Sequence, residues 1–193
     1  MTITTNKKSL DQIKKFFDKN DWKPLPFQIQ SWEAYLNGEN GIIQVPTGCG
    51  KTYAALMGPL SKLNDCRKKS GLNILLITPL KALSRDLKNA IDSAAKYFDE
   101  EITVGIRNGD TSPYEKKKQI LNPPNILITT PESLSLLLSN KESKNIFKNL
   151  FSIIIDEWHE LMGSKRGNQC ELCLSWLRGN KKDLQIWAMS ATI

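Results

Sequence analysis

The stretch Ile42–Thr52, with the sequence IIQVPTGCGKT, decides the fold. Its first residues form a short apolar run that predicts a buried β-strand, and a helical pattern begins at Lys51. Gly48 and Gly50 allow the backbone between them to bend so that successive N–H groups point inward, where the helix dipole adds positive potential. The stretch therefore predicts a phosphate-binding loop made of Pro46, Thr47, Gly48, Cys49, Gly50, Lys51 and Thr52.

Two residues of this loop carry side chains suited to a nucleoside triphosphate. We expect Lys51 to reach the β- and γ-phosphates and the hydroxyl of Thr52 to ligate Mg²⁺. The strict loop pattern has glycine where this chain has Val45, but the GxGKT core lies in the required strand-to-helix context. The alternative is a plain glycine turn with a solvated Lys51, and the context disfavours it.

A second apolar run, residues 151–155, leads directly into Asp156, Glu157, Trp158 and His159. In a chain with a phosphate loop, a buried strand that ends in two acids predicts a hydrolytic site. Asp156 would hold Mg²⁺ together with Thr52, and Glu157 would orient and deprotonate the attacking water. The predicted catalytic residues are therefore Lys51, Asp156 and Glu157. Alternatively, the two carboxylates cap the helical segment that follows.

The rest of the chain alternates between short apolar runs and longer helical patterns. Most of the apolar runs are nearly continuous Ile, Leu and Val, which is typical of parallel strands covered on both faces. Alternation of strand and helix predicts an α/β fold with a mostly parallel sheet. We expect strands at 41–45, 73–77, 102–106, 126–129, 152–155 and 185–189, and helices at 9–17, 27–36, 51–63, 82–97, 114–120, 133–138 and 168–177.

Composition limits the class of protein. The chain has 193 residues, of which 40% are hydrophobic, and its net charge of +7 favours a polyanionic partner such as nucleic acid. It has neither an apolar run long enough to span a membrane nor an apolar N-terminal signal segment, so we expect a protein without a membrane partner. Cys170 and Cys173 are expected to be small apolar residues on a helix, which fits a reducing cytoplasm.

The ordered motifs resemble the first RecA-like domain of superfamily 2 DExH-box helicases. The segments PLPFQIQSW, RNGDTSPYEKKKQ and DEWHELMGSKRGNQCEL are more similar still to the large-helicase-related (Lhr) family, and to its bacterial DNA-ligase-associated branch. The resemblance extends from Trp22 to Thr192. It implies a RecA-like P-loop NTPase domain with three αβα layers over 1–193, in which residues 1–36 form a helical extension similar to a Q motif. The motifs that carry the resemblance are PTGCGKT, TPLKAL, TPESL, DEWHEL and SAT.

The resemblance also implies roles for particular residues. Gln28 is similar to the glutamine that reads the adenine edge, with Trp22 or Phe27 near the base; alternatively, Gln28 is a solvated helix residue. Contacts to the backbone of a nucleic-acid strand are implied for Lys81, Arg85, Gly109, Asp110, Thr111 and Thr130. Alternatively, Lys81 and Arg85 are ordinary solvated charges on a helix, and the other four residues only stabilise turns or cap helices. His159, Ser190 and Thr192 resemble residues that couple the nucleotide to the nucleic acid.

Together with the phosphate loop and the acid pair, which predict ATP and Mg²⁺ as cofactors, the resemblance implies the motor domain of an ATP-dependent DNA helicase. It also implies single-stranded DNA as partner and a role in DNA repair. An RNA-directed helicase of the same superfamily and a non-catalytic nucleotide-binding module stay open as alternatives. The resemblance also implies a second RecA-like domain with an arginine finger, which we expect in the parent protein and not within these 193 residues. Because such a finger is worth about 10³–10⁵ in rate, we expect the isolated chain to hydrolyse ATP slowly at best.

Overall fold

The computed structural model describes residues 2–65, 70–79 and 84–191, with side chains from residue 6 onward. Within these residues six strands form a single sheet in the order β1-β6-β5-β2-β4-β3, and every pair is parallel. This confirms the predicted α/β class. The strands are β1 (Gly41–Gln44), β2 (Ile74–Ile77), β3 (Val104–Arg107), β4 (Ile126–Thr129), β5 (Ser152–Ile155) and β6 (Gln185–Ser190).

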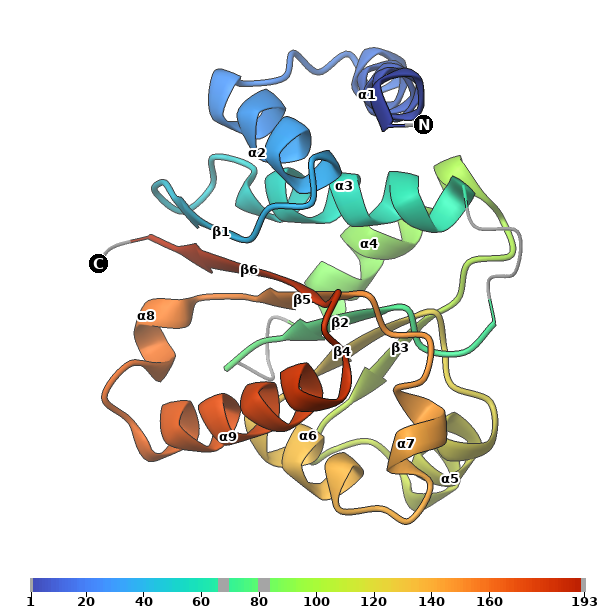
Figure 1. The fold of residues 1–193 in the computed structure, drawn as a ribbon, viewed down its shortest axis with the longest axis vertical. Helices are drawn as coiled ribbons and strands as arrows, with labels where there is room; N and C mark the ends of the chain where they lie inside the picture. Colours follow the sequence, from blue (N-terminus) through green and yellow to red (C-terminus); the bar gives the residue numbers. More distant parts are fainter. Residues whose placement is uncertain (1, 66–69, 80–83, 192–193) are drawn as a thin grey trace.

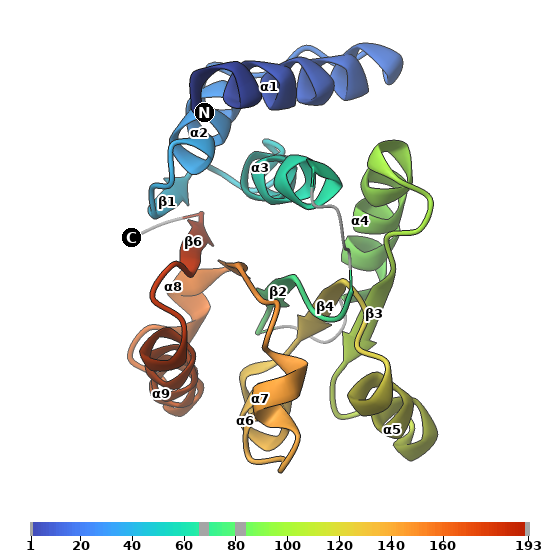
Figure 2. The same cartoon turned by 45° about the vertical axis from the view of Figure 1, so that its right-hand side comes forward.

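Helices cover both faces of the sheet (Figures 1 and 2). On one face lie α2 (Pro26–Leu36), α3 (Lys51–Asp65) and α4 (Ser84–Phe98), with α1 (Thr2–Lys19) packed outside α2 and α3. The opposite face carries α6 (Pro131–Leu138), α7 (Ser143–Ile146) and α9 (Lys165–Asn180). Two further helices, α5 (Pro113–Leu121) and α8 (Trp158–Leu161), follow β3 and β5 along the chain. The arrangement is the three-layer αβα sandwich that the resemblance implies.

The continuous apolar strands are explained by a core on each side of the sheet. Side chains of a strand alternate between faces, so Ile74 and Leu76 of β2 join the core beneath α3, whereas Leu75 and Ile77 join the core beneath α6 and α9. All four residues are fully buried. Both cysteines of α9, Cys170 and Cys173, lie in the second core as free thiols, as predicted.

Local capping accounts for the earlier starts of two helices, whereas α1 extends over Thr2–Lys19, well beyond the expected 9–17. Helix α6 begins at Pro131 rather than at 133 because the hydroxyl of Thr130 accepts a hydrogen bond from the N–H of Ser133. Helix α9 begins at Lys165 rather than at 168 because Ser164 caps it in the same way through the N–H of Gly167. The sequence analysis missed α7 and α8, which are four residues long and too short to show a period.

The register of the sheet brings three chain segments together. Gln44 at the end of β1 lies beside Ser190 of β6, and Ile155 at the end of β5 lies beside Ala188. Because the strands are parallel, their carboxyl ends meet at one edge of the sheet, the usual position of a ligand site in such folds. Among the helices in the described ranges, none is both long and apolar enough to cross a membrane.

Two glycines of α9 provide a test of the packing. A Cβ atom on Gly167 would lie 2.0 Å from the carbonyl oxygen of Leu161, whereas a Cβ atom on Gly179 would meet nothing within 4 Å. We predict that Gly167→Ala lowers the free energy of unfolding by about 1–3 kcal/mol because the backbone must shift. Gly179→Ala should leave it unchanged or raise it by up to about 1 kcal/mol. Urea unfolding followed by circular dichroism checks both, and equal effects would contradict the packing described for α9.

Candidate active site

The predicted phosphate loop connects β1 to the first residue of α3. Gly48 and Gly50 adopt φ values of +81° and +78°, a region that favours glycine, and α3 begins directly afterwards. Opposite the loop lie α4 and the carboxyl end of β5. One pocket is lined by seven of the predicted site residues and by three residues of α4: Thr47, Gly48, Gly50, Lys51, Thr52, Asp156 and Glu157, together with Asp86, Leu87 and Ala90.

Lys51 is the central cation of this pocket. Its side chain is only 7% exposed. The ammonium group donates a hydrogen bond to the carbonyl oxygen of Val45 at 3.1 Å and lies 3.8 Å from Oε1 of Glu157. The sequence could not predict that the Val45 carbonyl accepts this hydrogen bond, because every residue has a backbone carbonyl. Lys51 therefore links the strand that precedes the loop to the acid pair.

Both acids of the pair are partly buried, and the side chain of Glu157 is 16% exposed. Burial, and then the negative charge of Glu157, raises the pKa of Asp156 to about 6, although the backbone N–H of Glu157 donates to Oδ1 of Asp156 at 3.0 Å. Glu157 itself adopts φ +45°, a left-handed conformation that is costly for a residue with a Cβ. Strain of this kind persists where the surrounding structure enforces it, and it is common at functional sites.

His159 joins the acid pair to the end of β6. Its Nδ1 lies 3.3 Å from Oε2 of Glu157 and 3.2 Å from Oγ of Ser190. Oε2 of Glu157 is buried and has no hydrogen bond of good geometry. A single ring nitrogen cannot donate to both neighbours at once, so the tautomer of His159 determines which contact is a hydrogen bond. The structure thus connects Lys51, Glu157, His159 and Ser190 through successive contacts.

The residues of the pocket fit a magnesium-bound nucleotide. The partly buried carboxylate of Asp156, whose pKa is raised, and the hydroxyl of Thr52 are oxygen donors of the kind that Mg²⁺ prefers. Within the described ranges, no three His, Cys, Asp or Glu side chains cluster to hold a metal by themselves.

Gln28 has a structural role that the sequence did not reveal. Its side-chain Oε1 accepts from the N–H of Leu25 at 2.9 Å, and its Nε2 donates to the carbonyl oxygen of Gly50 at 3.1 Å. The residue is 4% exposed, so the alternative of a solvated helix residue is wrong. Gln28 fastens the start of α2 to the phosphate loop, and a side chain on Gly50 would collide with it, with a Cβ atom 2.7 Å from Nε2.

Trp22 and Phe27, the two residues expected near the adenine base, lie in different surroundings. Trp22 is 42% exposed, and its ring packs against those of Phe16, Phe17 and Tyr53, the last residue being next to Thr52. Phe27 lines another hollow, beside the outer edge of β1. Neither ring lines the pocket of Lys51, and their proximity to a base stays a prediction.

The residues expected to contact nucleic acid are only partly brought together. Gly109 and Thr130 line one hollow at the ends of β3 and β4. The hydroxyl of Thr111 donates to the carbonyl oxygen of Ile106, and the N–H of Asp110 donates to the side chain of Asn108. Both residues thus make hydrogen bonds within the turn after β3, as the alternative interpretation predicts. The hydroxyl of Thr130 caps α6. Arg85 is exposed on α4, whereas Lys81 and Thr192 lie outside the described residues.

The contacts of Gln28 generate a stability prediction. Gln28→Ala leaves the N–H of Leu25 and the carbonyl of Gly50 without their partners, so we expect the free energy of unfolding to fall by about 1–3 kcal/mol. Gln30→Ala is the matched control, because Gln30 is an exposed residue of the same helix and its loss should cost less than about 0.5 kcal/mol. Chemical unfolding measures both, and equal losses would contradict the role of Gln28.

Comparison with known proteins places this geometry in a family. The family model described as DEAD/DEAH box helicase matches residues 25–193. The ATP-dependent helicase Lhr-Core of Sulfolobus acidocaldarius is 42% identical over 166 residues, which are 81% of this chain and 19% of that protein. The Lhr helicase/probable uracil glycosylase of Mycolicibacterium smegmatis is 36% identical over 166 residues, 80% of this chain and 11% of that protein.

Solved structures of helicases also match the fold of this chain. The Mycobacterium smegmatis helicase Lhr bound to ssDNA and AMP-PNP matches with a TM-score of 0.86 and 33% identity, over 94% of this chain and 24% of that one. Helicase MrfA bound to DNA and AMPPNP matches with a TM-score of 0.81 and 26% identity, over 94% of this chain and 26% of that one. The chain thus spans only about a tenth to a quarter of the length of these relatives. It belongs to the DEAD/DEAH box helicase family, and its matched region is the first RecA-like domain.

Proposed function

We propose that this chain is the ATP-binding motor domain of a longer ATP-dependent helicase that moves on single-stranded DNA. The observation that carries the proposal is the chain of contacts from Lys51 through Glu157 and His159 to Ser190. A binding module would need only the phosphate loop. A motor must also communicate the state of the nucleotide to other parts of the molecule, and this series of polar contacts provides a route.

Four side chains of the pocket have distinct parts in hydrolysis. The loop N–H groups and Lys51 bind the phosphates, and the Thr52 hydroxyl and Asp156 would hold Mg²⁺, which would neutralise phosphate charge. Glu157 orients a water molecule and takes its proton as the water oxygen attacks the γ-phosphorus. The bond from that phosphorus to the oxygen of ADP then breaks. Lys51 Nζ lies 3.8 Å from Oε1 of Glu157, so phosphates that attract Lys51 would draw it away and leave Glu157 free to act as the base.

The end of β6 is well placed to sense this change. The N–H of Val45, at the start of the loop, donates to the carbonyl oxygen of Ser190 at 3.2 Å, and the Ser190 hydroxyl meets His159. We propose that Ser190, with Thr192 after it, transmits the state of the loop to the nucleic acid. A second RecA-like domain of the longer protein would supply the arginine finger, so the chain by itself should turn over slowly.

The proposed partner of the chain is single-stranded DNA. Two relatives that share at least 26% identity were solved with DNA, which favours DNA over RNA for this chain. The +7 net charge agrees with either nucleic acid. The buried free thiols of Cys170 and Cys173 agree with activity in the reducing cytoplasm. Membership of the ligase-associated branch and a role in repair stay predictions.

Two substitutions separate nucleotide binding from hydrolysis. We predict that Lys51→Ala weakens binding of a fluorescent ATP analogue with Mg²⁺ at least about tenfold, since a buried charge-assisted contact to phosphate is worth about 1.5–3 kcal/mol. Glu157→Gln should retain binding while residual hydrolysis falls to background, and chelation of Mg²⁺ should weaken binding by the wild-type chain.

The control is Lys117→Ala, which removes an exposed lysine of α5 that is not among the residues lining the pocket, and which should bind and hydrolyse ATP like the wild type. Unchanged nucleotide affinity in Lys51→Ala, with the fold intact by circular dichroism, would contradict the proposed site. Hydrolysis that persists in Glu157→Gln would contradict the role of Glu157 as the base.

A further inference from the structure

Helix α8 presents two polar residues, His159 and Glu160, of which the proposed function gives a role only to the first. The helix is anchored on both sides of them, since Leu161 is fully buried in the second core and Trp158 packs against the same core. The N–H of Glu160 donates to the carbonyl oxygen of Glu157 at 2.9 Å, which fixes the turn between the acid pair and α8. His159 and Glu160 are therefore held outside the core, next to the acid pair.

The imidazole of His159 lies between two carboxylates at almost equal distances. Its Nδ1 is 3.3 Å from Oε2 of Glu157, and its Nε2 is 3.4 Å from Oε1 of Glu160. A neutral imidazole carries one proton, so its N–H can face only one of these carboxylates. The position of that proton decides whether Glu157 receives a hydrogen bond from the ring.

The environment of Oε2 of Glu157 favours a proton on Nε2. This oxygen is buried and, among the described residues, has no hydrogen bond of good geometry, although Nδ1 lies next to it. The contact of Nδ1 that has such geometry is the one with the hydroxyl of Ser190, at 3.2 Å. A hydroxyl can donate to a ring nitrogen that carries no proton. The geometry thus fits a ring whose Nδ1 accepts from Ser190.

The distribution of positive charge favours the same tautomer. The ammonium of Lys51 lies 3.8 Å from Oε1 of Glu157 and compensates the charge of this carboxylate. Glu160, in contrast, has His159 as its ion-pair partner in the described part of the chain. Its side chain is 56% exposed, so water weakens its attraction for the ring proton without removing it. Glu160 therefore draws the proton to Nε2.

This tautomer matters for hydrolysis because it leaves one oxygen of the base available. Oε1 of Glu157 is the oxygen next to Lys51, so Oε2 is the one that remains to accept a proton. A hydrogen bond from Nδ1 to Oε2 would stabilise the negative charge of Glu157 and lower its affinity for a proton. With the proton of His159 on Nε2, that competing hydrogen bond cannot form.

We propose that Glu160 is a positioning residue of the hydrolytic site. Its carboxylate holds the proton of His159 on Nε2, and this leaves Oε2 of Glu157 free to take the proton of the attacking water. The inference rests on the proposed function, in which the water oxygen then bonds to the γ-phosphorus. Glu160 is not among the residues that line the nucleotide pocket, and it acts only through His159.

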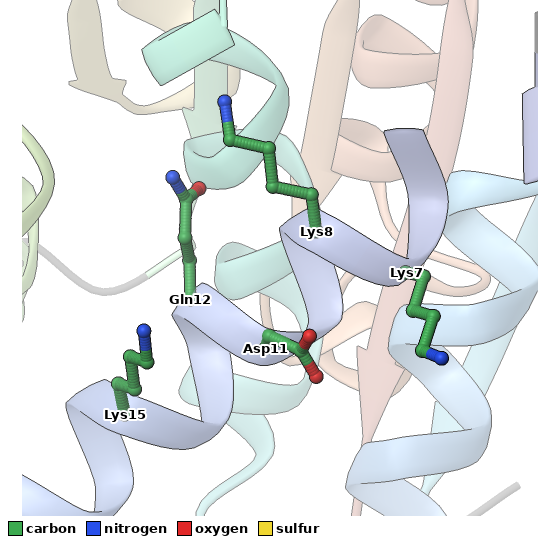
Figure 3. A pocket seen from close by; sticks show the side chains of 5 residues that line it. All are labelled: Lys7, Lys8, Asp11, Gln12 and Lys15. Atoms are coloured by element: carbon green, nitrogen blue, oxygen red, sulfur yellow. The ribbon is translucent and has the colours of Figure 1, made fainter. Parts of the chain in front are cut away.

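The charged side chains on α1 provide a contrast and a control. Figure 3 shows a hollow on this helix, where Lys8, Gln12 and Lys15 extend in the same direction. Asp11 also lines this hollow and is exposed. The chain has one histidine, and its carboxylate neighbours are on α8 and at the end of β5, so Asp11 has no ring to orient.

The single histidine makes a direct test possible. In long-range ¹H–¹⁵N NMR spectra, protonated and unprotonated ring nitrogens have well-separated nitrogen shifts, so the untagged, ¹⁵N-labelled chain reports the tautomer of His159 alone. The spectra are recorded without nucleotide at a pH of about 9, where an ordinary imidazole is neutral. We expect Nε2 to carry the proton in the wild type.

Substitutions of Glu160 should change the tautomer in proportion to the change in charge. Glu160→Ala should lower the ratio of the Nε2–H form to the Nδ1–H form by about two- to fivefold, the effect of a partly exposed charge pair. Glu160→Lys doubles the change in charge and should lower the ratio by about four- to 25-fold. The matched controls are Glu171→Ala and Glu171→Lys, which alter an exposed carboxylate of α9, and Asp11→Ala. All three should keep the wild-type ratio.

Hydrolysis provides the functional readout. Glu160→Lys should lower kcat of residual ATP hydrolysis at least about twofold, because the base then receives a hydrogen bond, while the affinity for a fluorescent ATP analogue stays unchanged. Circular dichroism shows whether each variant is folded.

Three results would overturn the role of Glu160. They are a wild-type ring with its proton on Nδ1, a ratio that the Glu160 variants leave equal to that of the Glu171 variants, and an altered ratio with unchanged kcat. Each of them leaves the proposed function standing if ATP still binds and hydrolysis still depends on Glu157. If the folded chain binds no ATP analogue, the proposed function fails, whereas the tautomer still reports on Glu160 because it is measured without nucleotide.

Discussion

The contact between the buried ammonium of Lys51 and the carboxylate of Glu157 is the interaction on which the site depends. An ammonium that is 7% exposed must be compensated, and among the described residues the carbonyl oxygen of Val45 lies 3.1 Å and Oε1 of Glu157 3.8 Å from it. Both partners are positioned by the sheet, since β6 lies between β1 and β5 and fixes their separation. The order of the strands therefore sets the electrostatics of the pocket.

The neighbouring elements hold this arrangement from two sides. Gln28 fastens α2 to the carbonyl of Gly50, so the helix before β1 supports the loop that follows it. On the other side, the left-handed backbone of Glu157 turns the chain into α8 and brings His159 to Ser190. A strained residue at this point is tolerated because the contacts of its side chain and of the next turn maintain it.

The strands and the position of the pocket could be predicted from the sequence, because apolar runs and the glycine loop with its acid pair are strong local signals. Continuous apolar runs predicted the strands, with 126–129 and 152–155 matching β4 and β5 residue for residue, and the glycine loop and acid pair located the pocket. What escaped prediction depends on long-range or backbone contacts. The partners of Gln28 are backbone groups, which no local pattern encodes.

The central claim is that loop, acid pair and the end of β6 respond to nucleotide as one unit. Hydrogen–deuterium exchange with and without a non-hydrolysable ATP analogue and Mg²⁺ tests it most directly. The account predicts that peptides covering 46–52, 156–159 and 187–190 gain protection together, and that Lys51→Ala removes all three gains. Protection confined to 46–52, with 156–159 and 187–190 unchanged, would contradict it.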